Sequence, residues 1–245
     1  MRIMFMGTPE FAEKSLKALV EDNREVVCVI TQPDKPKGRG YEMAMPEVKK
    51  YALLKGIDVY QPETLKDGAI LPLLEKYNPD IIIVVAYGKI LPEYILNFPP
   101  YGCINIHGSL LPRYRGAAPI QRAVIDGEEK SGVTSMYMEK GLDTGDMLLK
   151  TEVELAEDET GGSLHDKLME AGAKLILSTL EKIENGFEND EFKLYLQFIV
   201  DNKMKKIIAM LLVLTMALSL AACGASEAEG TAAPTGNDAS FTTIE

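Results

Sequence analysis

The strongest constraint on the fold is the run DIIIVVA (80–86), which is apolar at nearly every position. A strand with one face in water alternates apolar and polar residues, so this strand must be covered on both faces. Shorter apolar runs and amphipathic patterns surround it. The expected strands are 2–6, 25–31, 57–60, 80–86, 102–107, 132–138 and 147–155, and the expected helices are 9–22, 46–56, 70–77, 118–127 and 163–186. We therefore predict an α/β fold, with an open, mostly parallel, twisted, Rossmann-like sheet and helices on both of its faces.

Composition limits the classes of function. The chain of 245 residues has a formal net charge of -11 and an isoelectric point of about 4.8. This excludes a broad basic surface for nucleic acid, but not a local basic patch. Three Cys and two His offer neither a disulfide framework nor the ligand spacing of a metal site, so no metal is expected. Cys28 and Cys103 lie within apolar strands and are expected to be buried thiols.

The turn after the first strand reads Gly7-Thr8-Pro9. Thr8 is predicted to cap the following helix and Pro9 to be its first residue, which would direct backbone N–H groups to the top of the sheet. Such a turn can contact an anion, or it can be an ordinary connection between a strand and a helix. It has too few glycines for a dinucleotide fingerprint, so a nicotinamide cofactor is not expected.

Asn105 and His107 are the sharpest chemical feature. They are two residues apart on a predicted strand, so they share one face at its carboxyl end. An imidazole can exchange a proton near neutral pH, and an amide can donate to an oxyanion. Two polar residues at a strand end can also be merely structural. Asp143 or Asp146, in the loop GLDTGD, could orient the imidazole, but spacing alone does not decide this.

A long loop (31–46) follows the second strand and carries Lys35, Lys37 and Arg39 among prolines and glycines. Loops of this length without an element of their own are usually functional or mobile. In an acidic chain, these cations indicate a phosphate-bearing partner, and the alternative is a solvated mobile loop. Arginines further along the chain could extend the same patch, namely Arg113, Arg115 and Arg122. His165 is expected to be exposed or to cap the last helix.

The character of the chain changes after residue 186. An acidic, aromatic junction without clear periodicity (187–203) precedes a segment at 204–223 that has lysines, an apolar core and the sequence Leu-Ala-Ala-Cys at its end. We predict an apolar helix there, too short for a stable membrane span and typical of an export signal. The remaining residues (224–245) are small, polar and acidic, and are predicted to be disordered.

Four ordered segments resemble the methionyl-tRNA formyltransferases. They are MGTPEFA, TQPDKPKGRG, NIHGSLLPRYRGAAPIQRAVIDGE and GVTSMYMEKGLDTGDML. The similarity covers residues 1–186, the catalytic domain of that family. The N-x-H and SLLP elements are shared with formyltransferases that act on glycinamide ribonucleotide or sugar nucleotides, whereas the other segments are specific to the tRNA enzymes.

The resemblance implies transfer of a formyl group from 10-formyltetrahydrofolate, a co-substrate, to the amine of methionine on initiator tRNA. Asn105, His107 and Asp143 match the catalytic residues, with Asn105 donating to the oxyanion and Asp143 fixing the tautomer of His107. The folate-binding segment of the family matches Ser109, Leu110, Leu111 and Pro112. Arg39 matches the loop at the tRNA acceptor end, which Lys35 and Lys37 also occupy. No metal, a monomer and a cytoplasmic catalytic domain are expected.

After residue 186 the resemblance ends. The family continues into a linker and a small β-barrel domain, whereas residues 204–223 resemble a bacterial lipoprotein signal. A truncated gene joined to a neighbouring sequence would explain this, and so would a catalytic domain tethered to a membrane. Two other functions stay open: a folate-dependent formyltransferase for a small amine or sugar nucleotide, and an inactive remnant associated with the membrane.

Overall fold

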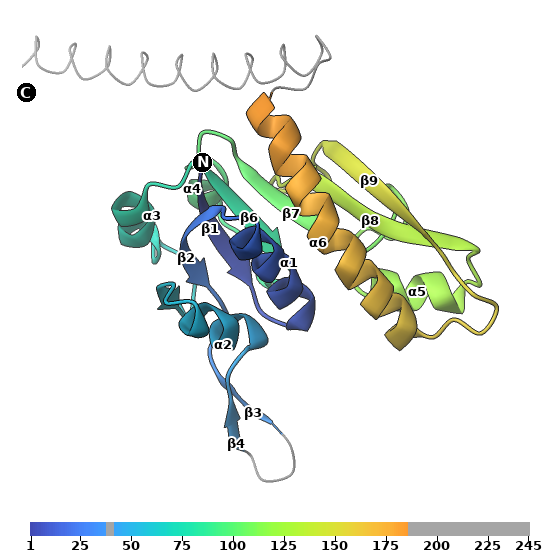
Figure 1. The fold of residues 1–245 in the computed structure, drawn as a ribbon. Helices are drawn as coiled ribbons and strands as arrows, with labels where there is room; N and C mark the ends of the chain where they lie inside the picture. Colours follow the sequence, from blue (N-terminus) through green and yellow to red (C-terminus); the bar gives the residue numbers. More distant parts are fainter. Residues whose placement is uncertain (38–41, 186–245) are drawn as a thin grey trace, which may run out of the picture. The chain divides into compact units, whose positions relative to one another are not determined.

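A seven-stranded sheet with the order β5-β2-β1-β6-β7-β8-β9 organises the fold (Figure 1). The computed structural model describes residues 1–37 and 42–185. In the order of the sheet, β5, β2, β1, β6 and β7 run parallel to one another, whereas β8 runs antiparallel to both β7 and β9. This confirms a mostly parallel, open sheet. The strands are β1 (Arg2–Gly7), β2 (Glu25–Ile30), β5 (Val59–Tyr60), β6 (Ile81–Val85), β7 (Cys103–His107), β8 (Lys130–Tyr137) and β9 (Met147–Glu154).

Helices cover both faces of this sheet. They are α1 (Glu10–Glu21), α2 (Glu47–Leu54), α3 (Leu71–Tyr77), α4 (Glu93–Leu96), α5 (Pro119–Ile125) and α6 (Gly161–Asn185). Figure 1 shows α1 and α6 side by side, and they contact each other and the sheet. On the opposite face, Met4, Met6 and Ile82 share a buried cluster with Leu74 of α3 and Ile95 of α4.

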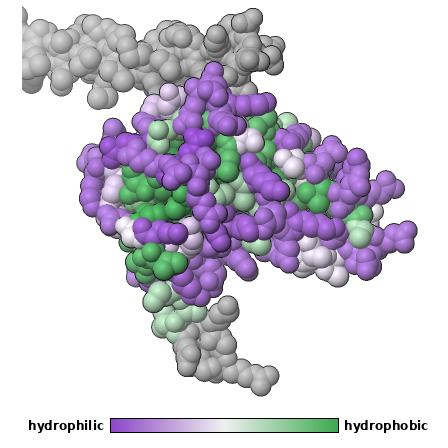
Figure 2. Space-filling model, in the orientation of Figure 1, coloured by the Kyte–Doolittle hydropathy of each residue, from purple (hydrophilic) through white to green (hydrophobic). Residues whose placement is uncertain are grey.

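The apolar runs bury both of their faces. All of Ile3–Met6 and Ile81–Ile83 are inaccessible to solvent, as a strand between two helical layers requires. Gly7 ends β1 where α1 approaches closely, since a Cβ there would lie 2.6 Å from the Cβ of Ala12. In Figure 2 the visible surface is mostly hydrophilic with smaller hydrophobic areas, as expected when each helix buries one stripe.

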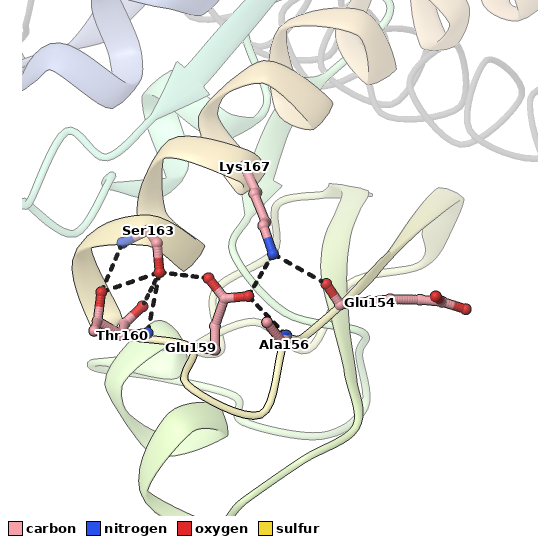
Figure 3. Close-up of polar contacts among 6 residues, drawn as sticks. All are labelled: Glu154, Ala156, Glu159, Thr160, Ser163 and Lys167. Carbon is pink, nitrogen blue, oxygen red and sulfur yellow. Dashed lines mark hydrogen bonds and ion pairs between the residues drawn. The ribbon is translucent and has the colours of Figure 1, made fainter.

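Polar contacts fix the start of α6 (Figure 3). The Glu159 carboxylate accepts from the Ala156 N–H at 3.0 Å and from the Ser163 hydroxyl at 2.5 Å, and it pairs with Lys167. The Ser163 N–H donates to Thr160 Oγ1 at 3.1 Å, in the manner of an N-cap. Lys167, then Ser163 and the Ala156 N–H, lower the pKa of Glu159 to about 2. This junction therefore holds a carboxylate whose side chain is only 4% exposed.

The loop after β2 contains an unpredicted hairpin. β3 (Lys35–Lys37) pairs antiparallel with β4 (Glu42–Ala44), so the expectation of a loop without its own element was wrong. Its strands are three residues long and lack an apolar alternation, and one of them contains Pro36. The short α4 was also not predicted, because four residues show no helical period.

The start of α1 also differs from the prediction. The helix begins at Glu10, and Pro9 occupies the N-cap without a side-chain hydrogen bond. Pro9 has an extended backbone, with φ −80° and ψ −179°, so it cannot be the first helical residue. Thr8 lies one residue too early to cap the helix, and its hydroxyl donates to the Tyr87 carbonyl at 3.4 Å.

Cys28 and Cys103 are buried thiols, as predicted, and burial raises the pKa of Cys28 to about 12. His165 is neither fully exposed nor a cap, because its ring packs edge-on against Phe11 at 5.6 Å between centroids.

The predictions for residues 187–203, 204–223 and 224–245 lie outside the described residues. The lipoprotein-like signal, the apolar helix and the disordered tail therefore stay predictions. Within residues 1–37 and 42–185, none of the helices combines the length and the apolar character that crossing a bilayer requires.

Candidate functional site

Asn105 and His107 lie on β7, at the carboxyl end of the parallel strands. The register pairs Asn105 with Val84 of β6 on one side and with Met136 of β8 on the other. His107 ends the strand opposite Thr134. Ligands of open α/β sheets bind at this edge, so the strand places both side chains where a substrate would enter.

The structure brings His107 and Asp143 together. His107 Nδ1 lies 3.5 Å from Asp143 Oδ2, and the side chains of the pair are 8% and 12% exposed. The other ring nitrogen, Nε2, lies 2.9 Å from the Tyr114 carbonyl and donates to it, because a carbonyl can only accept. Asp146, the alternative partner, is exposed, so the choice that the sequence left open falls on Asp143.

The loop RYRG (113–116) contacts both members of the pair. The Tyr114 carbonyl accepts from His107 Nε2, and the Gly116 N–H donates to Asp143 Oδ2 at 2.8 Å. Gly116 has a φ of +85°, a conformation that glycine adopts without strain. The loop therefore contacts both the imidazole and the carboxylate.

The Tyr114 side chain anchors this loop on the outside. Its hydroxyl lies 2.7 Å from Asp126 Oδ2 and 2.5 Å from Glu128 Oε1, and Arg113 also pairs with Glu128. The hydrogen bond to Glu128, then burial and Asp126, raise the pKa of the Tyr114 phenol, so the hydroxyl stays a donor at neutral pH.

Unusual backbone conformations gather around the site. Ala86, Tyr114 and Ala118 have φ values of 44°, 57° and 56°, in the left-handed region that alanine and tyrosine seldom adopt. Asp143 has a φ of 50°. Each such residue costs roughly 1–3 kcal/mol and persists where the surroundings require it, which often happens at functional sites.

Two cavities meet at Asn105 and His107. The first has a volume of about 390 Å³ and is bounded by the loop after β6 and the loop between β8 and β9. The second, of about 300 Å³, lies toward α1 and α5. Both cavities are lined by Ala86, Asn105, His107 and Gly116, and the polar surface of Asn105 and His107 that they share is called the wall below.

A third cavity leads toward the hairpin. It has a volume of about 750 Å³ and is lined by Lys35 and by residues at the starts of α1 and α2. Pro9 lines both this cavity and the 300 Å³ cavity. The hairpin, the two cavities and the wall at His107 therefore follow one another in space.

The SLLP segment (Ser109–Pro112) supports the loop that follows it and does not line the cavities at His107. Among the described residues that line the 390 Å³ and 300 Å³ cavities, none belongs to Ser109–Pro112. The buried Ser109 hydroxyl donates to the Arg113 carbonyl at 2.7 Å, and the Ser109 carbonyl accepts from Thr134. Lys150 donates to the Leu111 carbonyl at 2.5 Å. These contacts support the RYRG loop, and the assignment of Ser109, Leu110, Leu111 and Pro112 to folate stays a prediction.

The basic residues are placed only in part. Lys35 is exposed at the base of the hairpin, where it donates to Gln32 Oε1 at 2.8 Å. Arg39 and the side chain of Lys37 lie outside the described residues. Arg113 lies on the outer side of the site and pairs with Glu128. Within residues 1–37 and 42–185, no group of three or more His, Cys, Asp or Glu side chains is arranged to hold a metal ion.

Sequence reasoning missed the loop after β6. Tyr87, Lys89, Ile90 and Leu91 line the 390 Å³ cavity. Only their position in the sequence indicates a role, because they directly follow the most apolar parallel strand, at the edge of the sheet where ligands bind. The contribution of Tyr114 could not be found in this way, since its backbone carbonyl makes the contact.

Comparison with known protein families decides the family. The family profile described as formyl transferase matches residues 1–180. The chain belongs to the formyl transferase family. Its α/β fold, with the mixed sheet, is the fold of this family.

Curated relatives in the family are similar over the same region. The methionyl-tRNA formyltransferase of Acetivibrio thermocellus is 55% identical over 186 residues, which are 76% of this chain and 60% of that protein. The methionyl-tRNA formyltransferase of Agathobacter rectalis is 58% identical over 186 residues, with the same coverage. This chain therefore matches about 60% of the length of these relatives.

Solved structures share the fold at lower identity. Glycinamide ribonucleotide transformylase 1 from Symbiobacterium toebii has a TM-score of 0.64 and 21% identity, covering 76% of this chain and 88% of that one. A formyltetrahydrofolate deformylase from Pseudomonas syringae has a TM-score of 0.61 and 20% identity, covering 73% and 59% of the respective chains. At these identities the likeness describes the fold alone.

Proposed function

We propose that this chain transfers a formyl group from 10-formyltetrahydrofolate to the α-amine of methionine on initiator tRNA. The observation that carries the proposal is the wall of Asn105 and His107 shared by two cavities, with Asp143 beside His107, in a chain that is 55% identical to a methionyl-tRNA formyltransferase. Group transfer needs the donor and the acceptor to meet beside the same catalytic groups, and two cavities that share Asn105 and His107 allow this.

The 390 Å³ cavity is assigned to the formyl donor. Ile90 and Leu142 line it although they are 83% and 67% exposed, so apolar surface is available at its mouth. A planar heteroaromatic ligand would cover that surface on binding, and polar backbone groups of the surrounding loops would orient it.

The 300 Å³ cavity is assigned to the acceptor. It adjoins the 750 Å³ cavity through Pro9, and that cavity reaches Lys35 on the hairpin. A tRNA end that contacts the cations of the hairpin through phosphate could thus extend its aminoacyl group to His107. Lys35, Lys37 and Arg39 are proposed to supply these contacts.

The residues at the wall match the needs of the reaction. The amine nitrogen bonds to the formyl carbon, whose oxygen takes the negative charge, and collapse breaks the bond from that carbon to the folate nitrogen. Asn105 is proposed to donate its amide N–H to the oxyanion. His107 would donate there too, or carry the proton that the amine loses to the leaving nitrogen, and for either role its Nε2–H must turn from the Tyr114 carbonyl to the substrate. Asp143 would hold the ring of His107, and the transfer needs no covalent enzyme intermediate.

All of these groups come from one chain, so the proposed reaction requires no second copy. The test uses the full chain with 10-formyltetrahydrofolate and either methionyl initiator tRNA or glycinamide ribonucleotide. We expect formylmethionine after mild hydrolysis of the tRNA ester, and no formylated glycinamide ribonucleotide. Formylation of the small amine alone would overturn the assignment of the acceptor, and failure with both would overturn the proposal.

A further inference from the structure

A hydrogen bond joins the base of the hairpin to the loop after β6. Gln32, half-buried between β2 and the hairpin, donates through Nε2 to the Tyr87 carbonyl at 2.7 Å. The same carbonyl accepts from the Thr8 hydroxyl, which follows β1, at 3.4 Å. Because β2, β1 and β6 are neighbours in the sheet, these contacts connect the carboxyl ends of three adjacent strands.

The Tyr87 carbonyl lies in a turn with an unusual backbone. Ala86 and Gly88, on either side of Tyr87, have φ values of 44° and 78°. The left-handed region is unfavourable for alanine, so surrounding contacts must hold this turn. Ala86, Tyr87 and Gly88 line the 390 Å³ cavity, which is assigned to the formyl donor. A contact that holds the turn therefore shapes that cavity.

Gln32 is itself held in place. Its backbone carbonyl accepts from Gln61 Nε2 at 2.8 Å, and its Oε1 accepts from Lys35 at 2.8 Å. The amide also lies close to the turn, since a Cβ at Gly88 would lie 2.7 Å from Gln32 Nε2. The two ends of the carboxamide thus have separate partners: the oxygen contacts the hairpin, and the nitrogen contacts the turn at the donor cavity.

We propose that Gln32 is a positioning residue for the formyl donor and acts through the Tyr87 carbonyl. This inference rests on the proposed function. Without the Nε2 donor, the turn 86–88 would populate other conformations, and the apparent affinity for the donor would fall with the fraction that fits it. Bound donor restores the turn, so the rate at saturating donor should stay close to the wild-type rate. A residue that only stabilised the fold would lower Tm and would not discriminate between the two substrates.

The test compares two substitutions at Gln32 in the full chain. Gln32→Met keeps the length of the side chain and removes both hydrogen bonds of the carboxamide, whereas Gln32→Glu keeps an acceptor for Lys35 and removes the donor. We expect both variants to raise Kd for 10-formyltetrahydrofolate about tenfold, because the Tyr87 carbonyl loses its shorter hydrogen bond. In Gln32→Met, the single-turnover rate at saturating donor and the Kd for methionyl tRNA should stay near the wild-type values. The converse control is Lys35→Ala, which leaves the amide nitrogen in place and should leave donor Kd unchanged.

A double-mutant cycle with Gly88→Ala measures the same contact independently. The added Cβ would displace the Gln32 amide, so Gly88→Ala should raise donor Kd in the wild-type chain. In a Gln32→Ala background there is no amide to displace. Since both substitutions remove one hydrogen bond, the Kd of the double variant should be about tenfold lower than the product of the two single effects predicts.

Three results would overturn the inference while leaving the proposed function standing. They are an unchanged donor Kd in Gln32→Met and Gln32→Glu, equal increases in Kd for donor and methionyl tRNA in Gln32→Met, and multiplicative effects in the cycle. Should Gln32→Met not fold, Gln32→Glu and the cycle decide. Absence of 10-formyltetrahydrofolate binding by the wild type would instead overturn the proposed function, and the inference with it.

Discussion

Both ring nitrogens of His107 face oxygen atoms, and each oxygen belongs to a loop outside β7. Asp143 comes from the loop between β8 and β9, and the Tyr114 carbonyl comes from the loop after SLLP. These contacts restrict the rotation of the ring. At the scale of the residue, the candidate site is an imidazole with a fixed orientation beside the Asn105 amide.

Asp143→Asn tests the charged partner of His107. The variant keeps the volume of the side chain and an acceptor for the Gly116 N–H, but it removes the carboxylate charge. We expect kcat for formyl transfer to fall about 10²-fold, because the ring loses the group that orients it during proton transfer. Steady-state kinetics with methionyl tRNA checks this. The control is Asp146→Asn in the same loop, and equal kinetics for the two variants would contradict the role of Asp143.

Tyr114→Phe tests the anchor of the RYRG loop. Without the hydroxyl, Asp126 and Glu128 lose their shared donor and the carbonyl on His107 is held less firmly. We expect kcat to fall about tenfold, which corresponds to ~1.4 kcal/mol, while KM for the folate donor stays unchanged. The exposed Tyr101, changed to Phe, is the control. A rise in KM without a change in kcat would mean that the loop binds the donor and does not position His107.

At the scale of the element, α6 depends on the polar contacts at its start. The folded-state pKa of Glu159 is lowered from 4.5 to about 2, so its stabilising effect is complete above pH 4.5 and is lost as the pH falls through about 2. We expect Glu159→Gln to lower Tm at neutral pH, and the difference from the wild type to shrink between pH 4.5 and 2. Thermal unfolding across this pH range measures the difference, and Glu157→Gln is the control. A difference in Tm between Glu159→Gln and the wild type that does not vary with pH would contradict this account.

The hairpin is the element proposed to meet tRNA. Lys35→Ala should weaken use of methionyl tRNA and leave donor KM unchanged, because a cation on an exposed strand contacts phosphate and not the folate. The slope of the logarithm of the binding constant against the logarithm of the salt concentration should become less steep by about one. Binding measured over a range of salt concentrations checks this, with Lys174→Ala on α6 as the control. Equal effects of the two variants would show that Lys35 acts only through the overall charge.

The parts of the fold that were predictable are those with a strong apolar pattern. Residues 81–85 of DIIIVVA and the stripe of α6 bury their side chains in the layers that their periodicity requires. The hairpin β3–β4 lacks such a pattern, and Pro36 argues against a strand. For the site, period two put Asn105 and His107 on one face, but the approach of Asp143 depends on the antiparallel pairing of β7 with β8. Sequence spacing does not determine that pairing.

At the scale of the whole molecule, three neighbouring cavities run from the hairpin to the loop after β8. They are the 750 Å³ cavity at Lys35, the 300 Å³ cavity and the 390 Å³ cavity. The hairpin follows β2, the wall stands on β7, and the far side of the donor cavity comes from the loop after β8. On the proposed function, one chain would bind a phosphate-bearing acceptor and a planar donor in cavities that share His107. The central claim is that transfer takes place at this wall.

The most direct measurement is the single-turnover rate of formyl transfer to methionyl initiator tRNA, for the wild type, His107→Ala and Asn105→Ala. Binding of the folate donor is measured separately for each. The account predicts that each substitution lowers the rate about 10²–10³-fold while donor Kd stays nearly constant, because these groups stabilise the transition state. A rate equal to the wild-type rate in both variants would contradict it, and so would a loss explained fully by weaker donor binding.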